Sequence, residues 1–228
     1  PLSVTASVMF GQMYVLPVVT GFLDAFPTMK ARTLFIDRPV NIVDEGIDVA
    51  VRIGHLPDSG LSAIKVGSVR RVVCGSPAYF DRHGIPTTPS DLRDHRIAAS
   101  TSAWASPEWR FSDDFRVTID AALQCNTNEA AITSAREGWG LTRVLNYQIG
   151  PDLMAGDLYI LLREFAEPPL PIHLMHPEGR EATPKTRAFL DMAVCRPPDD
   201  TSLDCTGRHG AIQNTSRSFQ TPLRFSSV

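Results

Sequence analysis

The chain has 228 residues, and its 43% hydrophobic content is enough for a buried core, which argues against disorder over most of its length. Its 22 lysines and arginines and 25 aspartates and glutamates leave a net charge of only −3. A domain that binds nucleic acid usually has a basic surface, because its affinity comes largely from lysines and arginines that neutralise phosphates. We therefore expect any DNA-contacting part of the protein to lie outside this sequence.

The first 75 residues alternate β-branched runs with amphipathic helical stretches, a pattern typical of a mostly parallel sheet covered by helices. A strand at 2–6 leads into a helix whose apolar positions recur at helical spacing from Val15 to Phe26, and Pro27 ends it. The elements expected next are a strand at 33–36, a short helix at 40–45 ended by Gly46, and strands at 48–53 and 69–75.

A second lobe is expected to begin at residue 76, where prolines introduce two short helices. It should contain a helix at 128–137 and strands at 97–100, 115–119, 123–125, 141–144 and 158–162. A strand at 172–175 returns to the first lobe, and Thr183 and Pro184 open a last helix as N-cap and first helical residue.

The fold class that follows is α/β, with two Rossmann-like lobes. The expected division is 1–75 for the first lobe, 76–171 for the second, 172–196 for the return to the first, and 197–228 for a disordered tail. The tail is rich in serine, threonine, proline and arginine and has no sustained periodicity.

Several segments of the chain, taken in order, resemble one known family. They are VTASVMFG at 4–11, LP at 16–17, FLDAFP at 22–27, DR at 37–38, VDEGIDVAVRIG at 43–54, LPDS at 56–59, RRVVCGSPAY at 70–79, PSDL at 89–92, GWGL at 138–141 and PKTRAFLD at 184–191. The segment at 43–54 is the most specific. Together they resemble the effector-binding domain of LysR-type transcription regulators over about residues 1–194.

The resemblance implies a fold similar to that of type 2 periplasmic binding proteins, with two lobes joined by two crossover strands and a ligand cleft between them. It also implies an N-terminal winged helix-turn-helix that is missing here and that alone would contact DNA. The partners implied are a small-molecule effector, for which a carboxylate is the expected class, and a second copy of the chain in a homodimer or tetramer. We expect the helix at 15–26 of one chain to pair with the helix at 128–137 of its partner.

Candidate ligand-binding residues follow the carboxyl ends of strands, where loop N–H groups and helix N-termini face a cleft. They are Ser7, Val8, Met9, Phe10, Arg52 and Gly54 in the first lobe, and Thr101, Ser102, Thr127, Asn128 and Arg143 in the second.

Each candidate also has an ordinary structural explanation. Ser7 and the residues at 127–128 are natural helix caps, and the residues at 101–102 suit a solvated loop. Arg143 suits a surface position, and Arg52 could form a salt bridge with Asp37 or Asp48. The sequence leaves these alternatives open.

The sequence gives little support for catalysis, a metal site or a cofactor. It has no GxSxG elbow, P-loop or GxGxxG turn. His173 and His176 are three apart in a predicted strand and should point to opposite faces, which disfavours a shared metal. The four cysteines form no CxxC pair and are expected to be reduced. Neither an apolar window near 18 residues nor a signal peptide is expected. We therefore predict a cytoplasmic protein without membrane contact. The alternatives that remain are a solute-binding receptor of a transport system and an enzyme on the same fold.

Overall fold

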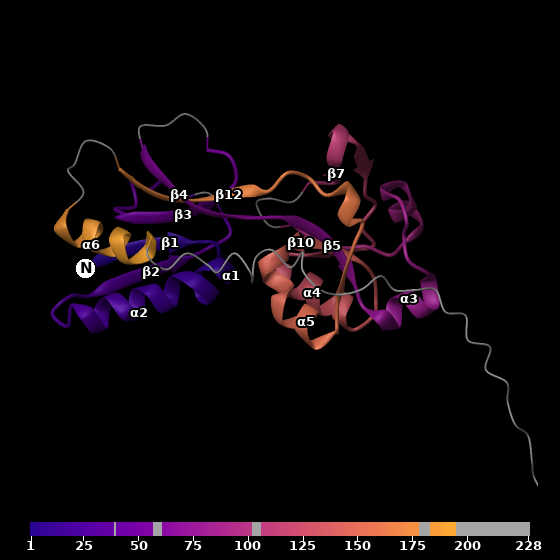
Figure 1. Ribbon diagram of the computed structural model, residues 1–228, viewed down its shortest axis with the longest axis horizontal. Helices are drawn as coiled ribbons and strands as arrows, with labels where there is room; N and C mark the ends of the chain where they lie inside the picture. Colours follow the sequence, from indigo (N-terminus) through magenta and orange to yellow (C-terminus); the bar gives the residue numbers. More distant parts are fainter. Residues whose placement is uncertain (39, 57–60, 102–105, 178–182, 195–228) are drawn as a thin grey trace, which may run out of the picture.

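The computed structural model describes residues 1–194 except 39, 57–60, 102–105 and 178–182. The tail predicted over 197–228 therefore lies outside the described residues. Two lobes lie side by side along the long axis of the molecule (Figure 1), one with the N-terminus and the other around β5 and β10.

The first lobe is built on a five-stranded sheet in the order β2-β1-β3-β12-β4. The strands are β1 (Leu2–Ala6), β2 (Ala31–Phe35), β3 (Val49–Ile53), β4 (Leu61–Val69) and β12 (Leu170–Pro177). β1 is parallel to β2 and β3, whereas β12 is antiparallel to β3 and β4. β1 is buried at all of its residues except Ser3, which is half-buried, as expected for a strand covered on both faces.

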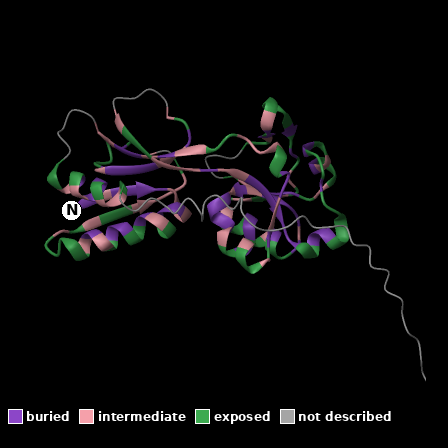
Figure 2. Cartoon of the chain, in the orientation of Figure 1, coloured by how far each residue is buried: buried purple, intermediate pink, exposed green. Residues whose placement is uncertain are grey.

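Helices cover this sheet, with their outer faces exposed (Figure 2). They are α1 (Val8–Phe10), a π-helical segment (Gly11–Val15), α2 (Leu16–Ala25) and α6 (Pro184–Val194). Phe22 of α2 and Phe189 of α6 pack edge to face with ring centroids 5.8 Å apart. The Thr183 hydroxyl accepts the Thr186 N–H at 3.4 Å, which confirms the predicted cap of the last helix.

The first three helical segments join into one 18-residue helix, Val8–Ala25, with a mean hydropathy of 1.3. By length and composition alone this helix, in the described part of the chain, could cross a membrane. This differs from the expectation that no window of the sequence approaches the roughly 18 apolar residues of a membrane span. The inner side chains of the helix, including Val18 and Phe22, belong to the core of the first lobe, as is usual for a helix that covers a sheet.

The second lobe is built around a three-stranded antiparallel sheet in the order β10-β5-β11. The strands of the second lobe are β5 (Arg71–Gly75), β6 (Ala98–Ser100), β7 (Glu108–Arg110), β8 (Arg116–Thr118), β9 (Leu123–Cys125), β10 (Thr142–Leu145) and β11 (Tyr159–Leu161). β6 pairs with β9 and β7 pairs with β8. Its helices are α3 (Pro77–His83), α4 (Asn128–Arg136) and α5 (Gly150–Ala155), with 3-10 turns at Pro89–Asp94, Ser112–Asp114, Asn146–Ile149 and Arg163–Phe165.

Several features differ from the sequence-based expectation, which included neither β7 nor α5. The sequence predicted a strand only from residue 69, so all of β4 except its last residue was missed. β4 is an edge strand of mixed polarity, and its residues show no clear strand period. Residues 40–45 form hydrogen-bonded turns rather than a helix, since the Asn41 side chain accepts the N–H groups of Val43 and Asp44. β5, which the sequence analysis grouped with the first lobe, pairs with β10 and β11 of the second.

The chain passes between the lobes twice, at Arg70 between β4 and β5 and again before β12. Asn146 holds the first crossover with two hydrogen bonds to Arg70. Its Oδ1 accepts the Arg70 N–H at 3.0 Å, and its own N–H donates to the Arg70 carbonyl at 2.9 Å. This arrangement fixes where the two lobes meet.

Candidate functional site

A cleft of about 1180 Å³ lies between the lobes and has walls from both of them. Among the described residues, its first-lobe wall includes Ser7, Asp37, Arg38, Arg52, Gly54 and His55, and its second-lobe wall includes Ser100, Trp109, Asn128, Arg143, Tyr147 and Gln148. Arg71 and Glu167, next to the two crossovers, also line it. The volume is sufficient for a small metabolite.

Ser7 follows β1 and is the N-cap residue of α1, with extended backbone angles. Behind it, the Val8 N–H donates to Asp37 Oδ1 at 3.0 Å, so a carboxylate of the protein itself already occupies this helix start. Val8, Met9 and Phe10 are not among the residues that line the cleft. Of the four candidates after β1, the structure brings Ser7 alone to the cleft wall.

Met9 and Phe10 instead join the first lobe to the 3-10 turn Asn146–Ile149 of the second. The buried Phe10 ring packs edge to face on Tyr147 at 5.3 Å, and Gln148 Nε2 donates to Met9 Sδ at 3.4 Å. Burial raises the pKa of Tyr147, and its hydrogen bond to Ser7 acts in the opposite direction. The segment after β1 is therefore an interlobe contact as well as a cleft wall.

Arg52 and Gly54 lie at the end of β3 and both line the cleft. Arg52 Nη2 donates to the Val40 carbonyl at 3.0 Å, and burial lowers the pKa of its guanidinium. Asp48, one of the two partners weighed for Arg52, instead accepts from Lys185 Nζ at 2.7 Å. Gly54 has a φ of +117°, which L side chains rarely adopt, and its N–H donates to the Pro171 carbonyl at 2.8 Å.

The remaining hydroxyl candidates in the second lobe support local structure. Thr101 donates from its backbone N–H and from its Oγ1 to the Cys125 carbonyl, at 2.6 and 3.1 Å. Thr127 caps α4 by accepting the Ala130 N–H at 3.3 Å. Neither residue lines the cleft, whereas their neighbours Ser100 and Asn128 do. The candidate Ser102 lies outside the described residues.

Arg143 is not the surface arginine that the sequence allowed, since its side chain is only 11% exposed. It lies over the rings of Trp109 and Phe111, 5.6 and 5.5 Å from their centroids, and donates from Nη2 to the Arg110 carbonyl and to Glu167 Oε2. Burial lowers the pKa of Arg143 to about 10, so it remains a cation at neutral pH.

The charges on the cleft wall are unequal. Its described residues include five arginines, Arg38, Arg52, Arg71, Arg110 and Arg143, and three carboxylates, Asp37, Glu108 and Glu167. An excess of guanidinium groups in a recessed site favours an anionic ligand, because these groups match carboxylate geometry. Arg71, Glu167 and the cleft role of Asp37 could not be predicted from the sequence, because only the folded chain brings them to this wall.

The described residues contain no group of three histidine, cysteine or acidic side chains that could hold a metal ion. Cys74 is buried on β5, where burial raises its thiol pKa to about 12, and Cys125 is half-buried. What the cleft offers is hydrogen-bond donors and positive charge for binding.

Comparison with known proteins gives one consistent result. A family model described as the LysR substrate binding domain matches residues 1–196. Curated relatives include an uncharacterized HTH-type transcriptional regulator of Haemophilus influenzae, 29% identical over 75% of this chain and 60% of its own length, and the HTH-type transcriptional regulator PgrR of Escherichia coli, 30% identical over 77% and 61%. The chain thus spans about 60% of the length of these relatives.

Solved structures agree on the fold. The regulatory domain of CrgA from Neisseria meningitidis matches with a TM-score of 0.76 and 23% identity, covering 86% of this chain and 98% of that one. The full-length virulence activator AphB of Vibrio cholerae matches with a TM-score of 0.75 and 21% identity, covering 85% of this chain and 67% of that one.

Proposed function

Because the chain belongs to the LysR substrate-binding domain family, the effector-binding part of LysR-type transcriptional regulators, we propose that it binds a small anionic molecule in the interlobe cleft and so changes how the regulator engages a promoter. The observation that carries the ligand class is the cleft wall, whose described residues include five arginines and three carboxylates. DNA contact is assigned to an N-terminal winged helix-turn-helix outside this sequence.

The proposed ligand contacts come from both lobes. Ser7 Oγ and the Arg52 guanidinium contribute from the first lobe, and the Asn128 amide and Arg143 contribute from the second. A molecule held by both walls is bound more tightly when the lobes are close, so binding shifts the population of lobe arrangements. The size of that shift is limited by the difference in affinity between the arrangements.

We further propose that two chains pair through α2. Its outer face exposes Leu16, which is 41% accessible, with Pro17 and Thr20 beside it at helical spacing. Met13 of the preceding π-helical segment, 38% accessible, continues this face. An exposed apolar stripe of this kind is typical of an interaction surface, and in a symmetric dimer each copy contributes both of the surfaces that pair. The partner surface proposed is the outer face of α4, which presents the small residues Ala130 and Thr133.

The rival functions have weaker support. The curated relatives are named as transcriptional regulators, not as transport receptors or enzymes, and a regulator that acts on DNA is placed in the cytoplasm. A turnover screen with candidate metabolites would expose an enzyme.

The proposal is tested by a thermal-shift screen of small mono- and dicarboxylates, each matched with its neutral amide. Carboxylates that raise the unfolding temperature more than their amides support an anion-binding cleft. A screen in which the amides stabilise the chain equally would contradict the proposed ligand class.

A further inference from the structure

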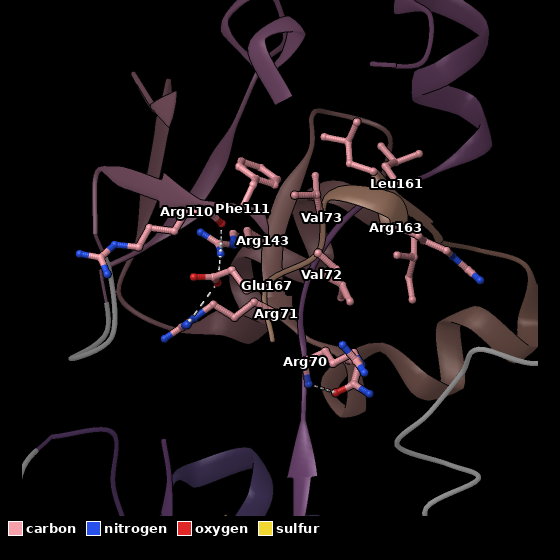
Figure 3. A pocket seen from close by; sticks show the side chains of 14 residues that line it. Arg70, Arg71, Val72, Val73, Arg110, Phe111, Arg143, Leu161, Arg163 and Glu167 are labelled. Atoms are coloured by element: carbon pink, nitrogen blue, oxygen red, sulfur yellow. Dashed lines mark hydrogen bonds and ion pairs between the residues drawn. The ribbon is translucent and has the colours of Figure 1, made fainter. Parts of the chain in front are cut away.

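A second, smaller cavity of about 130 Å³ adjoins the cleft within the second lobe. Arg71, Arg110, Arg143 and Glu167 line both spaces and so form the wall between them. The remaining wall is mostly apolar and consists largely of Val72, Val73, Phe111, Ile160, Leu161 and Leu162 (Figure 3). An apolar cavity of similar volume, about 150 Å³, is known to accept a benzene ring.

Positive charge dominates the polar side of this small cavity. Its described lining contains five arginines, Arg70, Arg71, Arg110, Arg143 and Arg163, but the single carboxylate of Glu167. Arg143 and Glu167 are well buried, with side chains 11% and 16% exposed. Cations in such a partly desolvated place attract an anion more strongly than they would at the surface.

Glu167 is shared between two guanidinium groups. Its Oε2 accepts from Arg71 Nη1 at 3.3 Å and from Arg143 Nη2, and Figure 3 shows the three side chains in a row. Both hydrogen bonds drawn from the Arg143 side chain leave from the same nitrogen, Nη2, although a guanidinium has five N–H donors. One internal carboxylate therefore neutralises only half of this cation pair.

We propose that the small cavity is a second ligand site, which binds a monocarboxylate with a compact apolar body, its carboxylate on Arg71 and Arg143 in competition with Glu167. The apolar body, up to the size of a single aromatic ring, lies against Val73 and Ile160. Arg71 and Arg143 also line the cleft, so the two sites share these cations.

The test uses the full chain and benzoate as the probe in calorimetric titration, with benzamide as the neutral match and acetate as the match without an apolar body. Benzoate is expected to bind saturably and at least about tenfold more tightly than either match. Benzamide lacks the negative charge that the arginines bind, and acetate lacks the ring that packs in the apolar cavity. Benzamide binding as tightly as benzoate, or no saturable binding of benzoate at millimolar concentration, would overturn the proposal.

Two variants locate the site. Glu167→Gln removes the competing charge and should raise benzoate affinity by about tenfold. Ile160→Phe fills the cavity and should abolish binding, whereas the matched change Ile64→Phe, on the exposed edge strand β4, should leave it unchanged. Unchanged or weaker binding to a folded Glu167→Gln chain, or full binding to a folded Ile160→Phe chain, would contradict the assignment.

A further pair of variants covers the case in which Glu167→Gln fails to fold, with Arg71 lining both spaces and Asn128 lining the cleft alone. Arg71→Gln, at a side chain that is 31% exposed, should weaken benzoate binding about tenfold. Asn128→Leu changes a residue of the cleft that does not line the small cavity and should leave benzoate affinity unchanged. A reversed pattern would place benzoate in the cleft and would refute a second site without refuting the cleft.

Discussion

Asp37 accepts the backbone N–H of Val8 at 3.0 Å, so the start of the helix beside the cleft carries its own carboxylate. The interaction joins residues 29 apart in sequence and fixes the loop after β2 against the loop after β1. It also means that an anionic ligand near Ser7 meets a helix start that is already neutralised, and must rely on side chains instead.

Replacing Asp37 with Asn should lower stability, because the charge-assisted bond to the Val8 N–H is lost or weakened. The expected cost is about 0.5–2 kcal/mol, similar to the loss of a helix cap, which corresponds to a few degrees in Tm for a chain of this size. Thermal unfolding measures it. Asp81→Asn, at an exposed position of α3, is the control, and equal Tm values for the two variants would refute the role of Asp37.

The contact between the Tyr79 hydroxyl and His95 should make the folding stability depend on the protonation of His95. The hydroxyl accepts the Arg96 N–H at 3.0 Å and lies 3.1 Å from His95 Nδ1, which can accept the hydroxyl proton when the imidazole is neutral. Burial lowers the pKa of His95 below 6.5, and the nearby His83 lowers it further, while Asp91 and Asp94 act in the opposite direction. The folded state therefore favours neutral His95.

The neutral state of His95 makes the free energy of unfolding depend on pH. The contribution of His95 is fully present above pH 6.5 and is lost as the pH falls from there through the lowered folded pKa, because the unfolded chain takes up the proton first. The free energy of unfolding from urea titrations should thus fall less between pH 7.5 and 5.5 in His95→Gln than in the parent chain. His173→Gln, where burial also lowers the pKa, should reduce the slope as well, and identical slopes in all three chains would be the contrary result.

Gly54→Ala should destabilise the first lobe at the edge of the cleft. The φ of +117° is strained for any residue with a Cβ, and the expected cost is about 1–3 kcal/mol. Gly150→Ala is the matched control, since Gly150 has helical angles and open space where a Cβ would lie. Thermal unfolding should show a lower Tm for the first variant only, and an equal loss in both would show that the backbone angle is not the cause.

Leu16→Glu should prevent pairing through α2 by placing a charge on its exposed apolar face. Light scattering at micromolar concentration should report a dimer for the parent chain and a monomer for the variant. Ile85→Glu makes the same change at a residue with the same 41% exposure in the second lobe, and should leave the dimer intact. A monomeric parent chain, or a dimeric Leu16→Glu variant, would count against the proposed interface.

The sequence predicted elements that depend on local chemistry. The buried run at Leu2–Ala6, the helix at Asn128–Arg136 and the Thr183 cap all follow from periodicity and capping, and the structure confirms them. The edge strand β4 was largely missed because its mixed polarity gives neither period clearly.

The cleft depends on contacts that sequence spacing does not reveal. Ser100 rather than Thr101 reaches the cleft wall, and the Thr101 hydroxyl instead donates to the Cys125 carbonyl. Glu167 meets Arg71 and Arg143 although they lie 96 and 24 residues away from it in sequence. Long-range pairing of this kind leaves no local pattern in the sequence.

The central claim is that the interlobe cleft binds an anionic effector through side chains of both lobes. Its most direct test is calorimetric titration of an effector carboxylate with the parent chain, Ser7→Ala and Asn128→Leu, alongside thermal unfolding to confirm that each chain is folded. Each lost hydrogen bond should cost about 0.5–3 kcal/mol, or roughly two- to a hundredfold in affinity, and the double variant should lose more than either single change. Unchanged affinity in the folded double variant would contradict the account, because it would place the effector outside the cleft.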